Sequence, residues 1–112
     1  MKINIKTIKV DLTPSFKTYI EEKFGQLEKF FEHFEKKGEV ELRVEVSRTT
    51  AHHKHGDVFR AVAGVHLSGK DLRAEEEAGD ARSAIDMAKD TLRLEIEKYR
   101  DKVLKPKRGK AK

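Results

Sequence analysis

The segment that follows Asp80 constrains the fold most, because it has the period of one long amphipathic helix. Its apolar residues recur at spacings of three or four, which places them on one side of a helix at about 100° per residue. These residues are Ile85, Ala88, Leu92, Ile96, Tyr99 and Val103. Such an apolar side has to pack against a core, so we expect stacked layers around one hydrophobic interior.

A row of basic residues runs beside that apolar side on the same helix. Four of them fall within roughly 20° of one line on the helical wheel. They are Arg82, Lys89, Arg93 and Arg100. Cations held in line on a rigid helix match a line of phosphates better than the same charges on a loop. The alternative is a solvated side whose cations pair with nearby carboxylates. Those carboxylates belong to Asp86, Asp90, Glu97 and Asp101.

The composition indicates one small basic domain. The 112 residues suffice for a single modest core, and charged residues make up 40% of them. A formal net charge of +5 and a pI near 9.4 favour a polyanionic partner. The lack of cysteine excludes disulfides, thiolate metal sites and cysteine nucleophiles, and no cofactor is expected. Without a signal-like start or a run of about 20 apolar residues, we expect a cytoplasmic protein with no membrane partner.

Four strands are predicted from alternating apolar and polar residues. They cover residues 2–10, 40–47, 59–67 and, as a short strand, 71–75. A first helix is expected over 14–37, with Thr13 as N-cap, Pro14 in the first turn and Gly38 as C-terminal cap. Its apolar side consists of Phe16, Tyr19, Ile20, Phe24, Leu27, Phe30, Phe31 and Phe34.

The resulting fold class is α+β, with the order β-α-β-β-β-α in one domain over residues 1–104. A helix between the first two strands makes them parallel if they are neighbours, and the hairpins make the later strands antiparallel. Both helices then pack on one face of a four-stranded mixed sheet. Every strong apolar pattern is used by this core, so no apolar pocket for a small molecule is expected.

Several short motifs in this order resemble one protein family. They are Ile3-Asn4-Ile5, Leu12-Thr13-Pro14, Lys23-Phe24, Leu27-Glu28-Lys29, Gly69-Lys70-Asp71-Leu72, Asp80 and Ala84-Ile85-Asp86. Together they cover residues 2 to about 103 and are similar to the ribosome hibernation-promoting factors, also called ribosome-associated translation inhibitor A. The resemblance implies a fold like that of double-stranded-RNA-binding domains, and a short form of the family.

The resemblance also implies a function. Members bind the small ribosomal subunit and its rRNA at the decoding centre, compete with mRNA and tRNA, and inhibit translation by occupancy without catalysis. Carried over by position, the basic residues that contact rRNA are Lys23, Lys29, Lys98, Arg100 and Lys102. Away from the ribosome we expect a monomer.

The chain departs from the family pattern at three positions of the second helix. Arg82 stands where the family usually has an aromatic residue, and Thr91 and Leu94 stand where it often has Lys and Arg. Lys89 and Arg93 restore the charge density nearby. These two and Arg82 therefore join the predicted RNA-binding residues.

Residues 105–112 form a basic tail with no apolar period, which we expect to be disordered. Its Lys105, Lys107 and Arg108 are candidates for RNA contact, and the alternative is a solvated terminus. The loop residues His52, His53 and His55 suggest metal ligands in composition only, since Lys54 lies among them and no cysteine is available. We therefore predict no metal site.

Two other functions remain open from the sequence. One is a generic double-stranded RNA-binding module, which the charge alone allows equally well. The other is a protein–protein regulatory adaptor that uses the polar face of the sheet, with Glu41, Arg43, Glu45 and Arg60. Clustered acidic residues such as Glu75 to Glu77 indicate sheet-edge charges rather than catalytic carboxylates, because no cleft is predicted around them.

Overall fold

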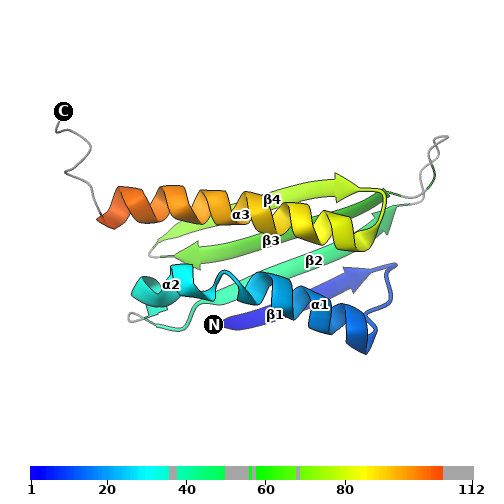
Figure 1. Cartoon of the computed structure of the whole chain (residues 1–112), viewed down its shortest axis with the longest axis horizontal. Coiled ribbons are helices and arrows are strands. Elements are labelled where there is room, and N and C mark those ends of the chain that lie inside the picture. Colours follow the sequence, from blue (N-terminus) through cyan, green and yellow to red (C-terminus); the bar gives the residue numbers. More distant parts are fainter. Residues whose placement is uncertain (36–37, 50–55, 57, 68, 105–112) are drawn as a thin grey trace.

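The computed structural model describes residues 1–35, 38–49, 56, 58–67 and 69–104, and it contains one sheet covered on one face by helices (Figure 1). In chain order the elements are β1 (Lys2–Ile8), α1 (Pro14–Gly25), α2 (Glu28–Glu35), β2 (Glu41–Thr49), β3 (Val58–Leu67), β4 (Lys70–Ala78) and α3 (Ala81–Leu104). The predicted α+β class is confirmed. In Figure 1, α1 and α2 run end to end over β1 and β2, while α3 lies alongside them over β3 and β4.

The four strands follow the order β1-β2-β3-β4. β1 is parallel to β2, with Lys2 opposite Glu41, and β3 is antiparallel to both β2 and β4. The prediction of a mixed sheet is confirmed. Because α1 and α2 together form the crossover between parallel strands, they are carried to the same face as α3.

The core lies between the sheet and the helices. The inward side chains of the strands alternate with outward polar ones, and on α3 the residues Ile85, Ala88, Leu92 and Ile96 are fully buried. Tyr99 is half-buried at the end of this row, and its hydroxyl donates to the carbonyl oxygen of Leu67 at 3.2 Å. The predicted apolar side of α3 is thus confirmed over these five residues, and the side chain at 103 lies outside the described part.

The single helix expected over 14–37 is wrong, because the chain forms two helices with a turn between them. The N–H groups of Gln26 and Leu27 donate to carbonyl oxygens three residues earlier, at 3.3 and 3.0 Å. This tighter turn ends α1, and α2 then resumes with Leu27 still buried. The expected end of the helix at residues 36–37 lies outside the described residues.

The strand boundaries also differ from the prediction: β2 runs from Glu41 to Thr49 rather than over 40–47, β3 begins one residue earlier, and β1 and β4 differ most. β1 ends at Ile8 rather than at residue 10, because Lys9 has a φ of 61° and turns the chain. β4 is longer than expected and includes the acidic run through Glu77. The acidic run fits in the strand because Glu75 contacts Arg60 of the neighbouring strand. The carboxylate of Glu76 points the other way and accepts a hydrogen bond from the Thr91 hydroxyl of α3.

Both predicted N-caps are present. The Thr13 hydroxyl accepts from the N–H of Phe16 at 3.1 Å, and Pro14 begins α1. At α3, Asp80 accepts from the N–H of Ser83 at 2.8 Å and from its hydroxyl at 2.9 Å. These hydrogen bonds hold the pKa of the Asp80 carboxyl below its usual range. They fix the first turn of α3 and therefore the direction of its cations.

Candidate nucleic-acid interface

Basic side chains of all three helices meet along the line where α1 and α2 lie beside α3, which we call the helix junction. At one end, the guanidinium carbon of Arg82 lies 4.5 Å from the centre of the Tyr19 ring. At the other end, the guanidinium carbon of Arg100 lies 5.2 Å from the centre of the Phe30 ring, and the Nζ of Lys29 lies 5.4 Å from that same centre. Cations from both sides of this line therefore share the junction along most of α3.

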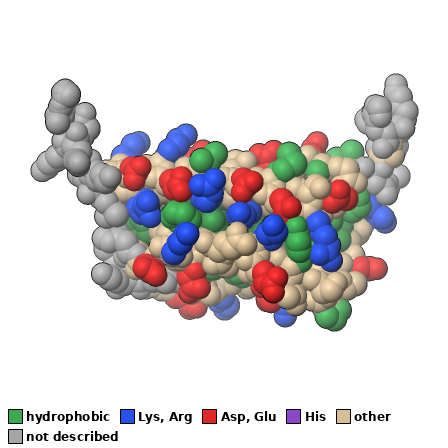
Figure 2. All heavy atoms as spheres, viewed as in Figure 1, with side chains coloured by type: hydrophobic (Ala, Val, Ile, Leu, Met, Phe, Trp, Pro, Cys, Tyr) green, Lys and Arg blue, Asp and Glu red, His purple; other side chains and the backbone are tan. Residues whose placement is uncertain are grey.

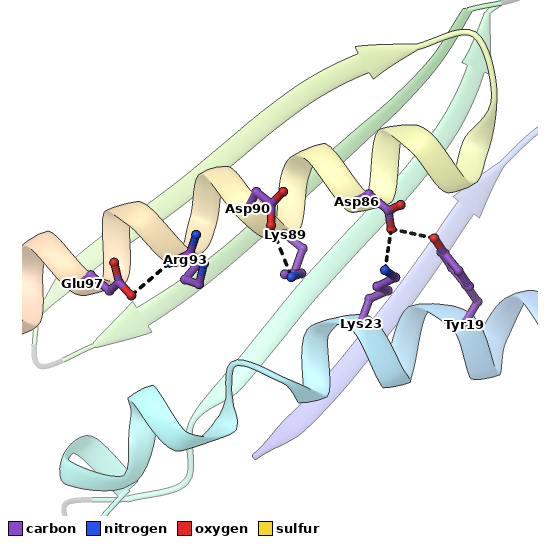
Figure 3. A network of polar contacts seen from close by, with 7 residues as sticks. All are labelled: Tyr19, Lys23, Asp86, Lys89, Asp90, Arg93 and Glu97. Carbon is purple, nitrogen blue, oxygen red and sulfur yellow. Dashed lines mark hydrogen bonds and ion pairs between the residues drawn. The ribbon is translucent and has the colours of Figure 1, made fainter.

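Six of the predicted residues lie along the junction, and we call them the junction cations. They are Lys23, Lys29, Arg82, Lys89, Arg93 and Arg100. Figure 2 shows Lys and Arg side chains spread along the middle of the helical face, with Asp and Glu side chains among them. In Figure 3, Lys89 and Arg93 project from the side of α3 that faces α1 and α2, and Lys23 projects from α1 toward α3. The row predicted on the helical wheel thus exists and gains a second side from α1 and α2.

The lysines nearest the centre of the junction are held by their stems. The Lys89 side chain is 16% exposed and the Lys23 side chain 31%, although both carry a charge. Their methylene groups therefore pack between the helices while the ammonium groups reach the surface. A cation with a packed stem loses less side-chain freedom when it binds a phosphate.

Three junction cations have carboxylate partners. Lys89 lies 3.2 Å from Asp90, and Arg93 donates to Glu97 at 3.1 Å (Figure 3). The third pair joins Lys23 of α1 to Asp86 of α3. The cation row and the carboxylate pairing expected as alternatives are therefore both present. Such solvent-facing ion pairs are worth at most about 1 kcal/mol, so a phosphate can replace the carboxylate at small cost.

Arg82 and Arg100 differ from those three. Within the described part of the chain, neither has a carboxylate at ion-pair distance, and each lies over an aromatic ring. Ring contacts of this kind orient a guanidinium without neutralising it. Lys29 also lies over a ring and has no carboxylate at ion-pair distance among the described residues, so it and these two arginines are the junction cations most available to a polyanion.

Asp86 of α3 lies inside the junction, opposite α1. Its Oδ1 accepts a hydrogen bond of 2.6 Å from the Tyr19 hydroxyl and lies 3.4 Å from the Nζ of Lys23 (Figure 3). Burial raises the pKa of Tyr19 to about 12, with further contributions from the hydrogen bond to Asp86 and from its charge. The Tyr19 hydroxyl therefore remains a donor at neutral pH. Sequence analysis missed this contact, because only the crossover places the two helices side by side.

Lys98 and Lys102 do not join the junction. Each lies about 160° from Arg82 around the axis of α3, on opposite sides of that line, and both are exposed. The Nζ of Lys98 lies 3.7 Å from Glu95, within α3 itself. Of the five residues suggested by family resemblance, Lys23, Lys29 and Arg100 thus lie at the junction, and Lys98 and Lys102 lie away from it. Lys105, Lys107 and Arg108 lie outside the described residues.

The opposite face of the sheet is open and carries charges of both signs. Arg60 and Arg73 both contact the Glu75 carboxylate, the latter at 3.1 Å, and His66 lies 2.6 Å from Asp71. A hollow of about 710 Å³ lies on this face, lined by polar and charged side chains of all four strands together with a few apolar ones. It is the surface that an adaptor would use, and five of its charged or titratable side chains contact one another.

The metal interpretation of the histidine loop is not tested, because residues 50–55 lie outside the described part. No group of three or more possible metal ligands occurs among the residues that are described. Over the same residues, no helix combines the length and apolarity needed to cross a bilayer.

Residues 3–104 match the family described as Sigma 54 modulation protein / S30EA ribosomal protein. The matched residues include the three helices and nearly all of the sheet. The chain belongs to this family. It is a family of ribosome hibernation factors, not of enzymes. The resemblance noted in the sequence is thereby confirmed.

Named relatives agree with this assignment. The chain is 29% identical to the ribosome hibernation promoting factor of Klebsiella oxytoca over 103 residues, which are 92% of this chain and 97% of that protein. It is 31% identical to the ribosome hibernation promotion factor of Bacillus subtilis (strain 168), again over 92% of this chain but over only 50% of the relative. The chain therefore spans nearly all of the first relative and half of the second.

Solved structures show the same fold. The N-terminal domain of Protein Y from Thermus thermophilus superimposes with a TM-score of 0.69 at 27% identity, covering 88% of this chain and 99% of that one. A ribosomal subunit interface protein from Coxiella burnetii gives a TM-score of 0.71 at 19% identity, covering 88% and 97%. At that identity the second likeness supports the fold alone.

Proposed function

We propose that this hibernation factor binds the small ribosomal subunit at the decoding centre and inhibits translation by blocking the mRNA and tRNA sites. The observation that carries the proposal is the set of junction cations, which α1 and α2 on one side and α3 on the other hold in one line. The names of the relatives supply the ribosome as the partner class. Inhibition then follows from occupancy, and no group on the protein has to react.

The geometry of the junction favours a folded RNA surface. Phosphates of folded rRNA occupy fixed positions, and cations from two rigid helices can match such positions on two sides at once. Base stacking contributes little, because the Phe30 ring is already covered by Lys29 and Arg100 and the Tyr19 ring by Arg82. Recognition is therefore by charge and shape.

The proposal is tested by co-sedimentation of the protein with purified small subunits over a series of salt concentrations. Binding should weaken with salt, with a log–log slope of roughly 0.7–0.9 for each neutralised phosphate. Added tRNA and mRNA should displace the protein. An affinity that does not change with salt concentration contradicts this mechanism, and so does binding that persists unchanged when tRNA and mRNA are present.

A variant with Lys23→Glu, Lys89→Glu and Arg93→Glu separates the alternatives. Ribosome binding should be lost if the junction is the binding surface, and kept if the protein is an adaptor acting through the open sheet face. Free duplex RNA at equal phosphate concentration should compete poorly. Competition as strong as that of small subunits would instead favour the generic double-stranded RNA-binding module.

A further inference from the structure

One carboxylate joins the two sides of the cation row. Asp86 belongs to α3, yet its Oδ1 contacts two residues of α1, Tyr19 at 2.6 Å and Lys23 at 3.4 Å (Figure 3). The Tyr19 ring in turn lies beneath Arg82, and the Nζ of Lys23 lies 5.5 Å from the centre of that ring. Two junction cations, one from each helix, are thus arranged around a single tyrosine that Asp86 holds in place.

The other carboxylates at the junction are connected differently. Asp90 pairs with Lys89 and Glu97 with Arg93, and both pairs stay within α3. Among the described polar contacts of the junction, those of Asp86 are the ones that link α3 to α1. Asp86 is also partly shielded, since its side chain is 43% exposed whereas that of Asp90 is 62% exposed. Its place in the structure is therefore distinct from that of a solvated counter-charge.

We propose that Asp86 is a positioning residue that makes the junction selective for a folded RNA surface over a flexible or generic one. It holds Lys23 and, through Tyr19, Arg82 in the spacing that the RNA meets. A lysine side chain that is already ordered pays less entropy on binding. This inference rests on the proposed function, because it concerns the same surface.

The sign of the expected effect distinguishes positioning from simple charge. Electrostatics alone predicts that removing a carboxylate from a phosphate-binding surface strengthens binding to any RNA. Positioning predicts the reverse for the ribosome, because a loosened Lys23 no longer matches fixed phosphates. The affinity for free duplex RNA should still rise, because a negative charge has been removed from the surface. The ratio of ribosome affinity to duplex affinity should therefore fall.

The test compares Asp86→Asn with Glu95→Gln, two substitutions that each remove one negative charge from α3. Glu95 pairs with Lys98, outside the junction, and its side chain is 42% exposed. Asparagine keeps an oxygen for the Tyr19 hydroxyl but loses the attraction for Lys23. We expect Asp86→Asn to bind small subunits about threefold to tenfold more weakly, the cost of ordering about one long side chain. Glu95→Gln should bind as well as the wild type or better. An Asp86→Asn protein that binds small subunits as tightly as the wild type overturns the proposal.

A double-mutant cycle shows whether Asp86 acts through Lys23. In a Lys23→Met background, Asp86→Asn should cause little further weakening, whereas equal weakening in both backgrounds contradicts the proposed role. Thermal unfolding of each variant checks that the fold is kept. If Asp86→Asn does not fold, Tyr19→Phe replaces it, since this change retains the charge and the ring and should also weaken binding. A wild type that fails to bind small subunits would refute the proposed function itself.

Discussion

The helix junction and the open sheet face both carry many charges, but they organise them differently. On the open face, basic and acidic residues face each other across strands: Lys2 is opposite Glu41, and Lys6 is opposite Glu45. At the junction, cations of α1, α2 and α3 follow one line; three of them have a carboxylate partner, and Lys29, Arg82 and Arg100 have none among the described residues. A net charge of +5 therefore does not locate a surface for a polyanion. The arrangement of the charges does, because unpaired cations in a line add their fields, whereas cross-strand pairs cancel theirs.

The largest effect should come from equal charge reversals on the two faces. One variant carries Lys23→Glu, Lys89→Glu and Arg93→Glu, and its control carries three reversals on the open face. The control changes are Lys2→Glu, Lys6→Glu and Arg43→Glu, so both variants have the same net charge. Ribosome affinity should fall by on the order of 100-fold or more in the first, since charge-assisted hydrogen bonds are each worth about 1.5–3 kcal/mol.

The open-face control should stay within a few-fold of the wild type, because only long-range repulsion changes there. Dissociation constants for small subunits at one fixed salt concentration measure both variants. Equal losses in the two proteins would show that net charge, not arrangement, drives binding, and would remove the distinction between the faces.

Two neighbouring residues of β2 compare the faces in stability. Leu42 is fully buried beneath the helices, whereas Arg43 is exposed on the open face. Leu42→Ala should lower the free energy of unfolding by about 2–5 kcal/mol, the usual cost of a core truncation. Arg43→Ala should change it by less than about 0.5 kcal/mol. Chemical denaturation measures both, and a similar loss for Arg43→Ala would show that the open face contributes to the core.

The ionisation of Tyr19 tests how closely the junction is packed. Its raised pKa, about 12, means that the folded protein favours the neutral phenol. Stability from this source is therefore complete below pH 10, the ordinary pKa of tyrosine, and is lost as the pH rises toward 12. Ultraviolet titration of tyrosinate should detect a late-ionising group that Tyr19→Phe removes and that Asp86→Asn shifts to lower pH. A wild type without such a late-ionising group would contradict this packing.

The smallest effect should come from two aspartates on different faces. Asp80→Ala removes the cap of α3 and should lower the midpoint of thermal unfolding at neutral pH, whereas Asp71→Ala removes one exposed contact with His66 and should leave the midpoint nearly unchanged. Because the pKa of Asp80 is lowered, its contribution is present above the usual aspartate range and is lost as the pH falls below it. The difference between wild type and Asp80→Ala should therefore shrink in acid.

Much of the architecture could be predicted from local patterns. Alternation identified the strands, and Thr13 and Asp80 marked two helix starts because capping depends on a few adjacent residues. The turn that separates α1 from α2 was missed for a physical reason. Phe24, Leu27 and Phe31 keep helical spacing across it, so the apolar period gives no sign of the turn. Gly25, a weak helix former just before the turn, was the available signal.

The helix junction could be predicted only in part. The row on α3 followed from the helical wheel, because it lies within one element. The contributions of Tyr19, Lys23 and Lys29 depend on how α1 and α2 pack beside α3, which no local period records. Family resemblance supplied both lysines but also Lys98 and Lys102, which point away from the junction. A match to the family pattern therefore suggests which residues are basic at corresponding positions, but it does not show which of them share one surface.

The crossover topology builds the cation row from two segments that are far apart in the sequence. One side of the row comes from residues 14–35 and the other from residues 81–104, with three strands made between them. A growing chain that has been made only as far as β4 has no α3 and hence no complete row. We therefore expect a newly made chain to acquire its affinity for a polyanion only once α3 has been made and has packed beside α1 and α2.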